Sequence, residues 1–175
     1  MEEQMARRLV AAEGKKLQQA GLVARTWGNI SCRIDENHFV ITPSGLDYET
    51  MTARDLVLMD IRNGVCCGAH KPSSEKGVHL AAYQTFPEVG YVIHTHQTYA
   101  TAIGLCGFEQ LAMTEEEAEK LGGIARAAYG LSSTEKLAGA VYDAMQSGAK
   151  VVFMVHHGVP VSYTHLRAHE TLSDL

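Results

Sequence analysis

The chain has 175 residues, which is long enough for one domain with a substantial buried core. Its formal net charge of −5 and its lack of a Lys/Arg cluster argue against nucleic acid and anionic membrane as partners. No apolar stretch approaches the roughly 20 residues of a membrane-spanning helix. The four cysteines have neither zinc-knuckle spacing nor the pattern of a secreted disulfide scaffold, so we expect a cytoplasmic protein with buried or half-buried thiols.

The predicted secondary structure starts with an amphipathic helix over residues 3–20, which Gly21 ends. Short strands separated by turn residues follow at Ile30–Ile34, Phe39–Thr42, Leu56–Ile61 and Val65–Cys67. Helices and strands then alternate: a helix from Ser73 or Ser74 to about Phe86, a strand at Val89–His96, a helix starting at Ala100–Leu105, a helix from a Ser132–Glu135 capping box through Met145, and a strand at Lys150–His156. This order predicts an α/β sandwich with a mixed or largely antiparallel sheet.

The strongest local motif is His94-Thr95-His96, in the predicted strand VGYVIHTHQ. Residues i and i+2 of a strand share one face, about 6–7 Å apart at the backbone, so both imidazoles can converge on one metal ion. A second predicted strand ends at His156-His157, and because adjacent residues point to opposite faces, one of this pair can join them. Three histidines leave an open coordination position, which is typical of a catalytic zinc or another divalent transition ion.

Glu75 lies in KPSSEKGVH, at the start of a predicted helix. The helix dipole favours an acidic residue there without any further role, whereas the functional alternative is a fourth metal ligand or a mobile base. His79 follows one helical turn later. We expect it to be a core histidine with satisfied hydrogen bonds, and the alternative is that it orients Glu75 or approaches the metal.

Three further segments carry turn residues whose backbone N–H and hydroxyl groups can bind an anion without any lysine. They are Gly28-Asn29 in TWGNIS, Ser44-Gly45 in TPSG, and Ser73-Ser74. Each segment taken alone is also ordinary turn chemistry. Trp27, beside the first segment, is expected to be a packing anchor.

In chain order, the segments G-N-I-S, T-P-S-G, K-P-S-S-E, H-T-H and H-H-G resemble the class II aldolase/adducin family, with their spacing in register from about residue 3 to residue 159. The resemblance implies a three-layer α/β/α sandwich with a central mixed, largely antiparallel sheet, and a homotetramer in the full-length form. It also implies a Zn²⁺ site and a site for the phosphate of a small sugar. The implied metal ligands are Glu75, His94, His96 and His157, with Glu75 also the catalytic acid/base, and the implied phosphate-binding residues are Gly28, Asn29, Ser44, Gly45, Ser73 and Ser74.

The activity that the resemblance implies is reversible cleavage of a ketose 1-phosphate to dihydroxyacetone phosphate and an aldehyde. A base removes a proton, the metal stabilises the resulting enediolate, and the phosphate orients the ketone. A sugar-phosphate 4-epimerase or a dehydratase on the same fold is the nearest alternative, and a non-catalytic adducin-like interaction module is another. Glu75 favours an aldolase over the epimerases, which carry aspartate there. The glutamates of MTEEEAEKLGG, where aldolases of the family often have a tyrosine, leave the reaction open.

The resemblance ends after residue 159, which predicts a family domain over residues 1–159 that is incomplete at its C-terminus. Residues 160–175, PVSYTHLRAHETLSDL, resemble translated sequencing-adapter read-through, so we expect a non-native tail. His165 and His169 have the i,i+4 spacing of a helical metal-binding pair, but no other part of the sequence indicates a second metal site.

Overall fold

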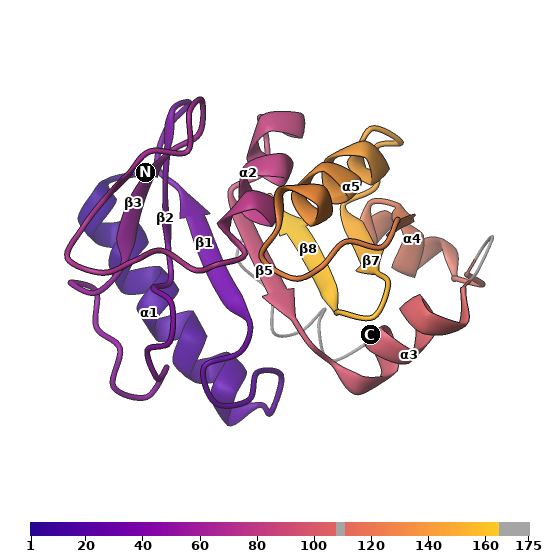
Figure 1. The fold of residues 1–175 in the computed structure, drawn as a ribbon, viewed down its shortest axis with the longest axis horizontal. Coiled ribbons are helices and arrows are strands. Elements are labelled where there is room, and N and C mark those ends of the chain that lie inside the picture. The colour runs from indigo at the N-terminus through magenta and orange to yellow at the C-terminus, as the bar shows by residue number, and fades with distance from the viewer. Residues whose placement is uncertain (108–110, 165–175) are drawn as a thin grey trace.

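Eight strands form one sheet in the computed structural model, which describes residues 1–107 and 111–164 (Figure 1). The strands are β1 (Asn29–Arg33), β2 (His38–Ile41), β3 (Val57–Asp60), β4 (Cys66–Cys67), β5 (Tyr91–Thr95), β6 (Ile124–Ala127), β7 (Val151–Met154) and β8 (Val159–Tyr163). Their order in the sheet is β4-β3-β2-β1-β5-β8-β7-β6, and each neighbouring pair is antiparallel except β6 with β7.

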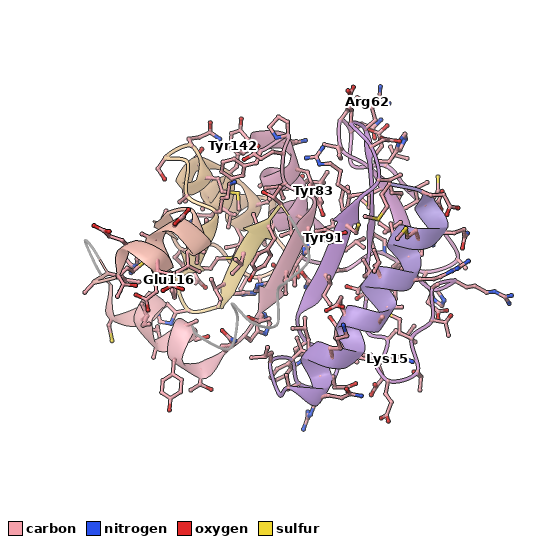
Figure 2. All side chains as sticks on the ribbon, turned by 180° about the vertical axis from the view of Figure 1, so that it is seen from behind. Lys15, Arg62, Tyr83, Tyr91, Glu116 and Tyr142 are labelled. Atoms are coloured by element: carbon pink, nitrogen blue, oxygen red, sulfur yellow. The ribbon has the colours of Figure 1, made fainter. Side chains whose placement is uncertain are left out.

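Helices cover both faces of this sheet. The helices are α1 (Glu3–Gln19), α2 (Lys76–Thr85), α3 (Thr98–Cys106), α4 (Glu115–Leu121) and α5 (Glu135–Met145). α1 packs on β1 and β2, and Figure 2, seen from behind, shows it in front of the sheet, whereas α2 and α5 pack together on the other face. Strand alternation divides the core accordingly: Val40 joins the cluster under α1, and Phe39 and Ile41 join the cluster under α2 and α5. The predicted three-layer α/β/α fold class is confirmed.

Several helix starts differ from the sequence-based expectation. α2 begins at Lys76 with Glu75 as its N-cap, so the predicted cap at Ser73 or Ser74 is wrong. α5 begins at Glu135, and the hydroxyl that accepts from the Leu137 N–H belongs to Thr134, so the predicted capping box at Ser132 is wrong. A capping box does exist at α4, which was not predicted: Thr114 accepts from the backbone N–H of Glu117, and the Glu117 carboxylate accepts from the backbone N–H of Thr114.

The last described strand, β8, lies inside the sheet between β5 and β7. All five of its residues are buried, and the strand continues beyond residue 159, where the domain was predicted to end. Pro160 pairs with His94 of β5, and because proline has no N–H it leaves one backbone hydrogen bond of this interior strand unmade. Residues 165–175 lie outside the described residues, as do the paired His165 and His169, so the origin of the tail stays a prediction.

Two expectations from composition have different outcomes. The thiols of Cys66, Cys67 and Cys106 are exposed, and only Cys32 is buried, so the expectation of buried or half-buried cysteines is wrong for three of the four. Within residues 1–107 and 111–164, no helix is both long enough and apolar enough to cross a membrane.

Candidate active site

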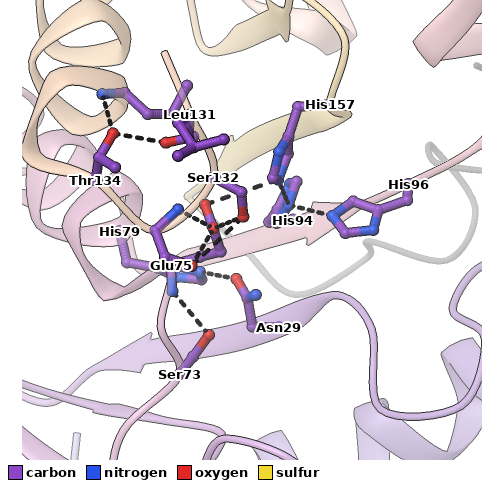
Figure 3. Close-up of polar contacts among 12 residues, drawn as sticks. Asn29, Ser73, Glu75, His79, His94, His96, Leu131, Ser132, Thr134 and His157 are labelled. Carbon is purple, nitrogen blue, oxygen red and sulfur yellow. Dashed lines mark hydrogen bonds and ion pairs between the residues drawn. The ribbon is translucent and has the colours of Figure 1, made fainter.

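Three histidine side chains converge where β5 ends beside the turn that joins β7 to β8. His94 lies in β5, His96 directly follows its last residue, and His157 lies in the turn. The His94 Nε2 atom is 2.8 Å from Nε2 of His96 and 3.2 Å from Nε2 of His157 (Figure 3). Pairing of Thr95 with Val159 at the start of β8 holds the turn next to the strand end. The structure therefore brings together the three histidines that the sequence singled out.

His156, the other member of the pair, does not join this cluster. Its side chain is exposed, and its ring meets the ring of Tyr129 edge-on at a centroid distance of 5.9 Å. Its backbone is left-handed, with φ 59°, which turns the chain so that His157 faces the other histidines.

The donor set of the three histidines fits a divalent transition ion. A neutral imidazole has one N–H and one lone pair, so three Nε2 atoms that face one another cannot all be satisfied by mutual hydrogen bonds. Burial lowers the pKa of all three rings, most strongly at His94, and the neighbouring imidazoles lower the pKa values of His94 and His96 further. The rings are therefore neutral at neutral pH, the form that binds a metal. Two nitrogens on one zinc are about 3.4 Å apart, which is close to the observed separations.

Glu75 approaches the histidines from the start of α2. Its side chain is buried, and its Oε2 atom lies 3.7 Å from Nε2 of His157. Its other oxygen, Oε1, accepts hydrogen bonds from the Ser132 hydroxyl at 2.7 Å and from the backbone N–H and hydroxyl of Ser133 at 2.7 and 3.0 Å (Figure 3). Oε2 has no hydrogen-bond partner among the described residues. The carboxylate is thus held by one oxygen and offers the other to the metal cluster.

The predicted anion-binding residues gather around one pocket of about 350 Å³. Three chain segments, at the start of β1, after β2 and before α2, supply Gly28, Asn29, Ser44, Gly45, Ser73 and Ser74. Glu75 and His96 line the same pocket, which joins it to the histidine cluster. None of the described residues that line it is a lysine or an arginine, so hydroxyl and backbone N–H groups near the N-terminus of α2 are the donors they offer to an anion.

Gly28 allows two chain segments beside this pocket to lie in close contact. Its φ of 81° is a conformation that residues with a Cβ rarely adopt. An added Cβ would also lie 2.7 Å from the Val23 side chain and 2.9 Å from the carbonyl oxygen of His94. Glycine is therefore required for the turn of TWGNIS to lie against the end of β5.

Two residues of the pocket have roles that the sequence did not reveal. Trp27 is 56% exposed and its ring is tilted toward His96 at a centroid distance of 6.3 Å, so the expected packing anchor is instead a wall of the pocket. Ser132 lines the pocket while it donates to Glu75. No local signal marks Ser132, because its partner lies far away in the chain.

His79 is a core histidine with satisfied hydrogen bonds, as was expected for it. It is completely buried, and both ring nitrogens are hydrogen bonded, Nδ1 to the Ser31 hydroxyl and Nε2 to the Asn29 side chain. Among the described residues no hydrogen bond joins it to Glu75 or to the three histidines, so the alternative of a residue that orients Glu75 finds no support.

Replacement of Gly158 by alanine is expected to destabilise the site and the fold. The new methyl group would overlap the carbonyl oxygen of Thr95 and lie 2.8 Å from Cδ2 of His96 and 3.0 Å from Cε1 of His94. Overpacking of this kind costs about 1–3 kcal/mol of unfolding free energy, which urea denaturation followed by circular dichroism would measure.

Gly139→Ala is the matched control for this substitution. A methyl group at Gly139, on the exposed side of α5, would meet no atom within 4 Å. A helical glycine replaced by alanine should raise the unfolding free energy by about 0.5–1 kcal/mol. Equal stability of the two variants would contradict the tight contact at Gly158.

The family to which the chain belongs follows from comparison with known proteins. The model of the class II aldolase and adducin N-terminal domain matches residues 8–168. The chain therefore belongs to the class II aldolase/adducin family, as its motifs predicted.

Particular relatives lie in two branches of sugar-phosphate chemistry. L-Ribulose-5-phosphate 4-epimerase UlaF of Salmonella paratyphi C (strain RKS4594) is 47% identical over 93 residues, which cover 52% of this chain and 40% of the relative. The match thus spans less than half the length of that relative. Among solved structures, an L-fuculose 1-phosphate aldolase is 31% identical with a TM-score of 0.85, covering 97% of this chain and 80% of the other.

A more distant structure has the same fold. The sugar-phosphate aldolase of Thermotoga maritima has a TM-score of 0.80 at 20% identity, with 97% of this chain and 90% of the other covered. By name, one of these relatives is an epimerase and the other two are aldolases of phosphorylated sugars.

Proposed function

We propose that this chain is a zinc-dependent aldolase that reversibly cleaves a ketose 1-phosphate to dihydroxyacetone phosphate and an aldehyde. The observation that carries the proposal is one continuous site, in which a buried carboxylate lies between a three-histidine cluster and an anion pocket. A non-catalytic adducin-like module would have no use for this combination. We also place the enzyme in the cytoplasm, where its exposed thiols stay reduced.

The pocket would bind the substrate through its phosphate, at a distance from the reacting carbons. The Ser73 and Ser74 hydroxyls line the pocket just before α2, where the helix dipole favours an anion. Gly28, Asn29 and the TPSG loop complete the grip from two other segments. Binding energy from this remote group fixes the position of the ketone and lowers the entropic cost of reaching the transition state.

His94, His96 and His157 would hold the metal, and Glu75 would be a further ligand until substrate binds. When bound, the ion supplies a Lewis acid that stabilises negative charge on the substrate oxygens. Glu75 would take the proton from the carbon beside the carbonyl through Oε2, the oxygen that faces the histidines. Ser132 and Ser133 keep hold of Oε1, so the carboxylate can pivot without leaving the site.

A 4-epimerase acting on a pentulose 5-phosphate is the second candidate function. The 47% identity to UlaF over 93 residues favours it, whereas Glu75 favours the aldolase, because the family resemblance implies aspartate at this position in epimerases. Both reactions need the same metal and phosphate contacts, so the products distinguish them.

The test is a product assay on the zinc-loaded protein. A panel of ketose 1-phosphates that includes L-fuculose 1-phosphate is incubated with the chain, and free dihydroxyacetone phosphate is measured with a coupled dehydrogenase. L-Ribulose 5-phosphate is incubated in parallel and its 4-epimer is measured by chromatography. Release of dihydroxyacetone phosphate supports the aldolase, and epimer formation without release would replace it with the second candidate.

We further propose a homotetramer for the full-length form, as in other family members. Large apolar side chains on the surface support an assembly interface, among them Tyr99, 78% exposed, and Leu131, 64% exposed. Light scattering that reports a monomer at micromolar concentration for a full-length form would contradict this assembly.

Ser73→Ala is expected to weaken recognition of the phosphate. The loss of one hydroxyl donor to a charged group should raise KM for the phosphorylated ketose by about tenfold or more. KM for the same ketose without its phosphate should stay unchanged. Steady-state kinetics on the two substrates measure the ratio, which separates phosphate binding from a general disturbance at Glu75, whose backbone N–H donates to the Ser73 hydroxyl.

Ser147→Ala is the control, because its hydroxyl donates only to the Ala144 carbonyl near the end of α5. It should leave both KM values at the wild-type level. Equal losses for both substrates in the Ser73 variant would refute the phosphate role.

A further inference from the structure

Four buried side chains form a continuous hydrogen-bonded row that ends at the anion pocket. The Tyr83 hydroxyl lies 2.8 Å from the Ser31 hydroxyl, which lies 2.6 Å from Nδ1 of His79. Nε2 of His79 lies 2.5 Å from Oδ1 of Asn29, a residue of the pocket wall (Figure 3). All four residues are at most 4% exposed. Residues of α2 are thus linked through β1 to the pocket.

The donor and acceptor roles along this row of hydrogen bonds follow from Tyr83. Ser31 is the only hydrogen-bond partner that the described residues offer to the Tyr83 hydroxyl, and a buried phenol O–H left without an acceptor is costly. Tyr83 therefore donates to Ser31. Ser31 then donates its own hydrogen to Nδ1 of His79, so that the ring carries its hydrogen on Nε2 and donates it to Asn29.

The environment of His79 requires this single-hydrogen form. Burial lowers the pKa of His79 to about 3, so the ring is neutral at neutral pH. A neutral imidazole has one donor and one acceptor, and the row uses both of them. With the hydrogen on Nδ1 instead, either Tyr83 or Ser31 would keep a hydroxyl hydrogen that no described residue accepts.

The consequence lies at the amide of Asn29. Its oxygen is tied to His79, which leaves its Nδ2 hydrogens for the pocket, and no described residue accepts a hydrogen bond from Nδ2. An amide turned the other way would present an oxygen lone pair to the same space and repel an anion. We propose that Tyr83, Ser31 and His79 are positioning residues that hold the Asn29 amide with its N–H donors toward the bound phosphate.

This inference rests on the proposed phosphate site and adds to it a reason why that site could bind phosphate with no lysine or arginine among its described lining residues. The order of hydrogens in the core determines whether a neutral amide attracts or repels the anion. If His79 only stabilised the fold, its replacement would lower the free energy of unfolding. Any change in phosphate affinity would then be the same with or without the Asn29 side chain.

A double-mutant cycle separates these two roles. The full chain with one equivalent of zinc is titrated with inorganic phosphate by isothermal calorimetry, as wild type, Asn29→Ala, His79→Leu and the double variant. Asn29→Ala should weaken phosphate binding about tenfold, the effect of one hydrogen bond to a charged group. His79→Leu should weaken it by a similar factor, and the double variant should be no weaker than Asn29→Ala alone.

Each outcome of the cycle decides something. Unchanged affinity in His79→Leu, or losses that multiply in the double variant, would overturn the positioning role while the phosphate site stands. Unchanged affinity in Asn29→Ala would remove Asn29 from the phosphate site, and the positioning role with it. His79→Gln, whose amide N–H can replace the Nε2 donor, should recover most of the affinity that leucine loses.

A spectroscopic measurement on the wild-type chain avoids any effect of substitution on folding. Nitrogen-15 NMR of the histidine rings distinguishes a hydrogen on Nε2 from one on Nδ1, and the signal of His79 is assigned by its loss in His79→Gln. The Nε2–H form is expected, with an unchanged signal from pH 5 to pH 8. The Nδ1–H form would reverse the row and overturn the inference.

Discussion

Replacement of His157 by asparagine should remove the metal from the site. The imidazole supplies one of three nitrogens that lie within 4.8 Å of one another, and two remaining ligands give an incomplete site. Zinc content measured by atomic emission should fall from about one ion per chain to near zero. Turnover should fall by more than about 100-fold, because even the loss of an outer-shell partner of a metal ligand costs about 10–100-fold.

His156→Asn is the matched control for that experiment. It changes the neighbouring residue in the same way, and asparagine tolerates the left-handed backbone that His156 adopts. Zinc content and turnover should both stay near the wild-type values. If His156→Asn released the metal and His157→Asn retained it, the assignment of the ligand would be wrong.

The second large effect is expected for Glu75→Gln. Glutamine keeps the shape of the side chain but is a poor base, so turnover should fall by about 10²–10⁴-fold, the usual contribution of a general acid or base. KM should change little, because the proposed phosphate contacts come from the serine, glycine and asparagine residues of the pocket and not from the carboxylate. Zinc content is measured on the same sample, so that a loss of metal is not mistaken for a loss of the base.

Glu49→Gln serves as the charge-matched control. Glu49 is exposed and lies after Asp47, away from the pocket, so removing its charge should leave kcat unchanged. A Glu75→Gln variant that retains full kcat with its metal bound would remove Glu75 from the chemistry.

The metal cluster was predictable in part because its signal is local. The alternation of a strand puts His94 and His96 on one face whatever the rest of the fold does. His157 could be paired with them only through the family pattern, since its contact depends on β8 lying beside β5. The same holds for the anion pocket, whose three turns are each ordinary and meet only in the tertiary structure.

The errors have the same physical origin. Ser132 has the spacing of a helix cap, and a local rule assigns it to the helix, but the hydroxyl instead donates to Glu75 across 57 residues. β8 escaped the prediction because VPVSY is short and carries a proline, and its strand conformation depends on two partners already present in the sheet. The missed α4 was within reach, because Thr114 and Glu117 have the spacing of a capping box.

The central position of β8 also makes the sheet vulnerable at its middle. If β8 detached, β5 and β7 would each expose an unpaired edge, the kind of surface on which chains aggregate. Its pairing with β5 joins Ile93 to Val161, which are far apart in the chain, and contacts between such residues are expected to form slowly. A metal ion that bridges His94 and His157 would bind only the docked form, and would thereby oppose detachment by mass action. The ion proposed for catalysis would therefore also reduce aggregation through the exposed strand edges.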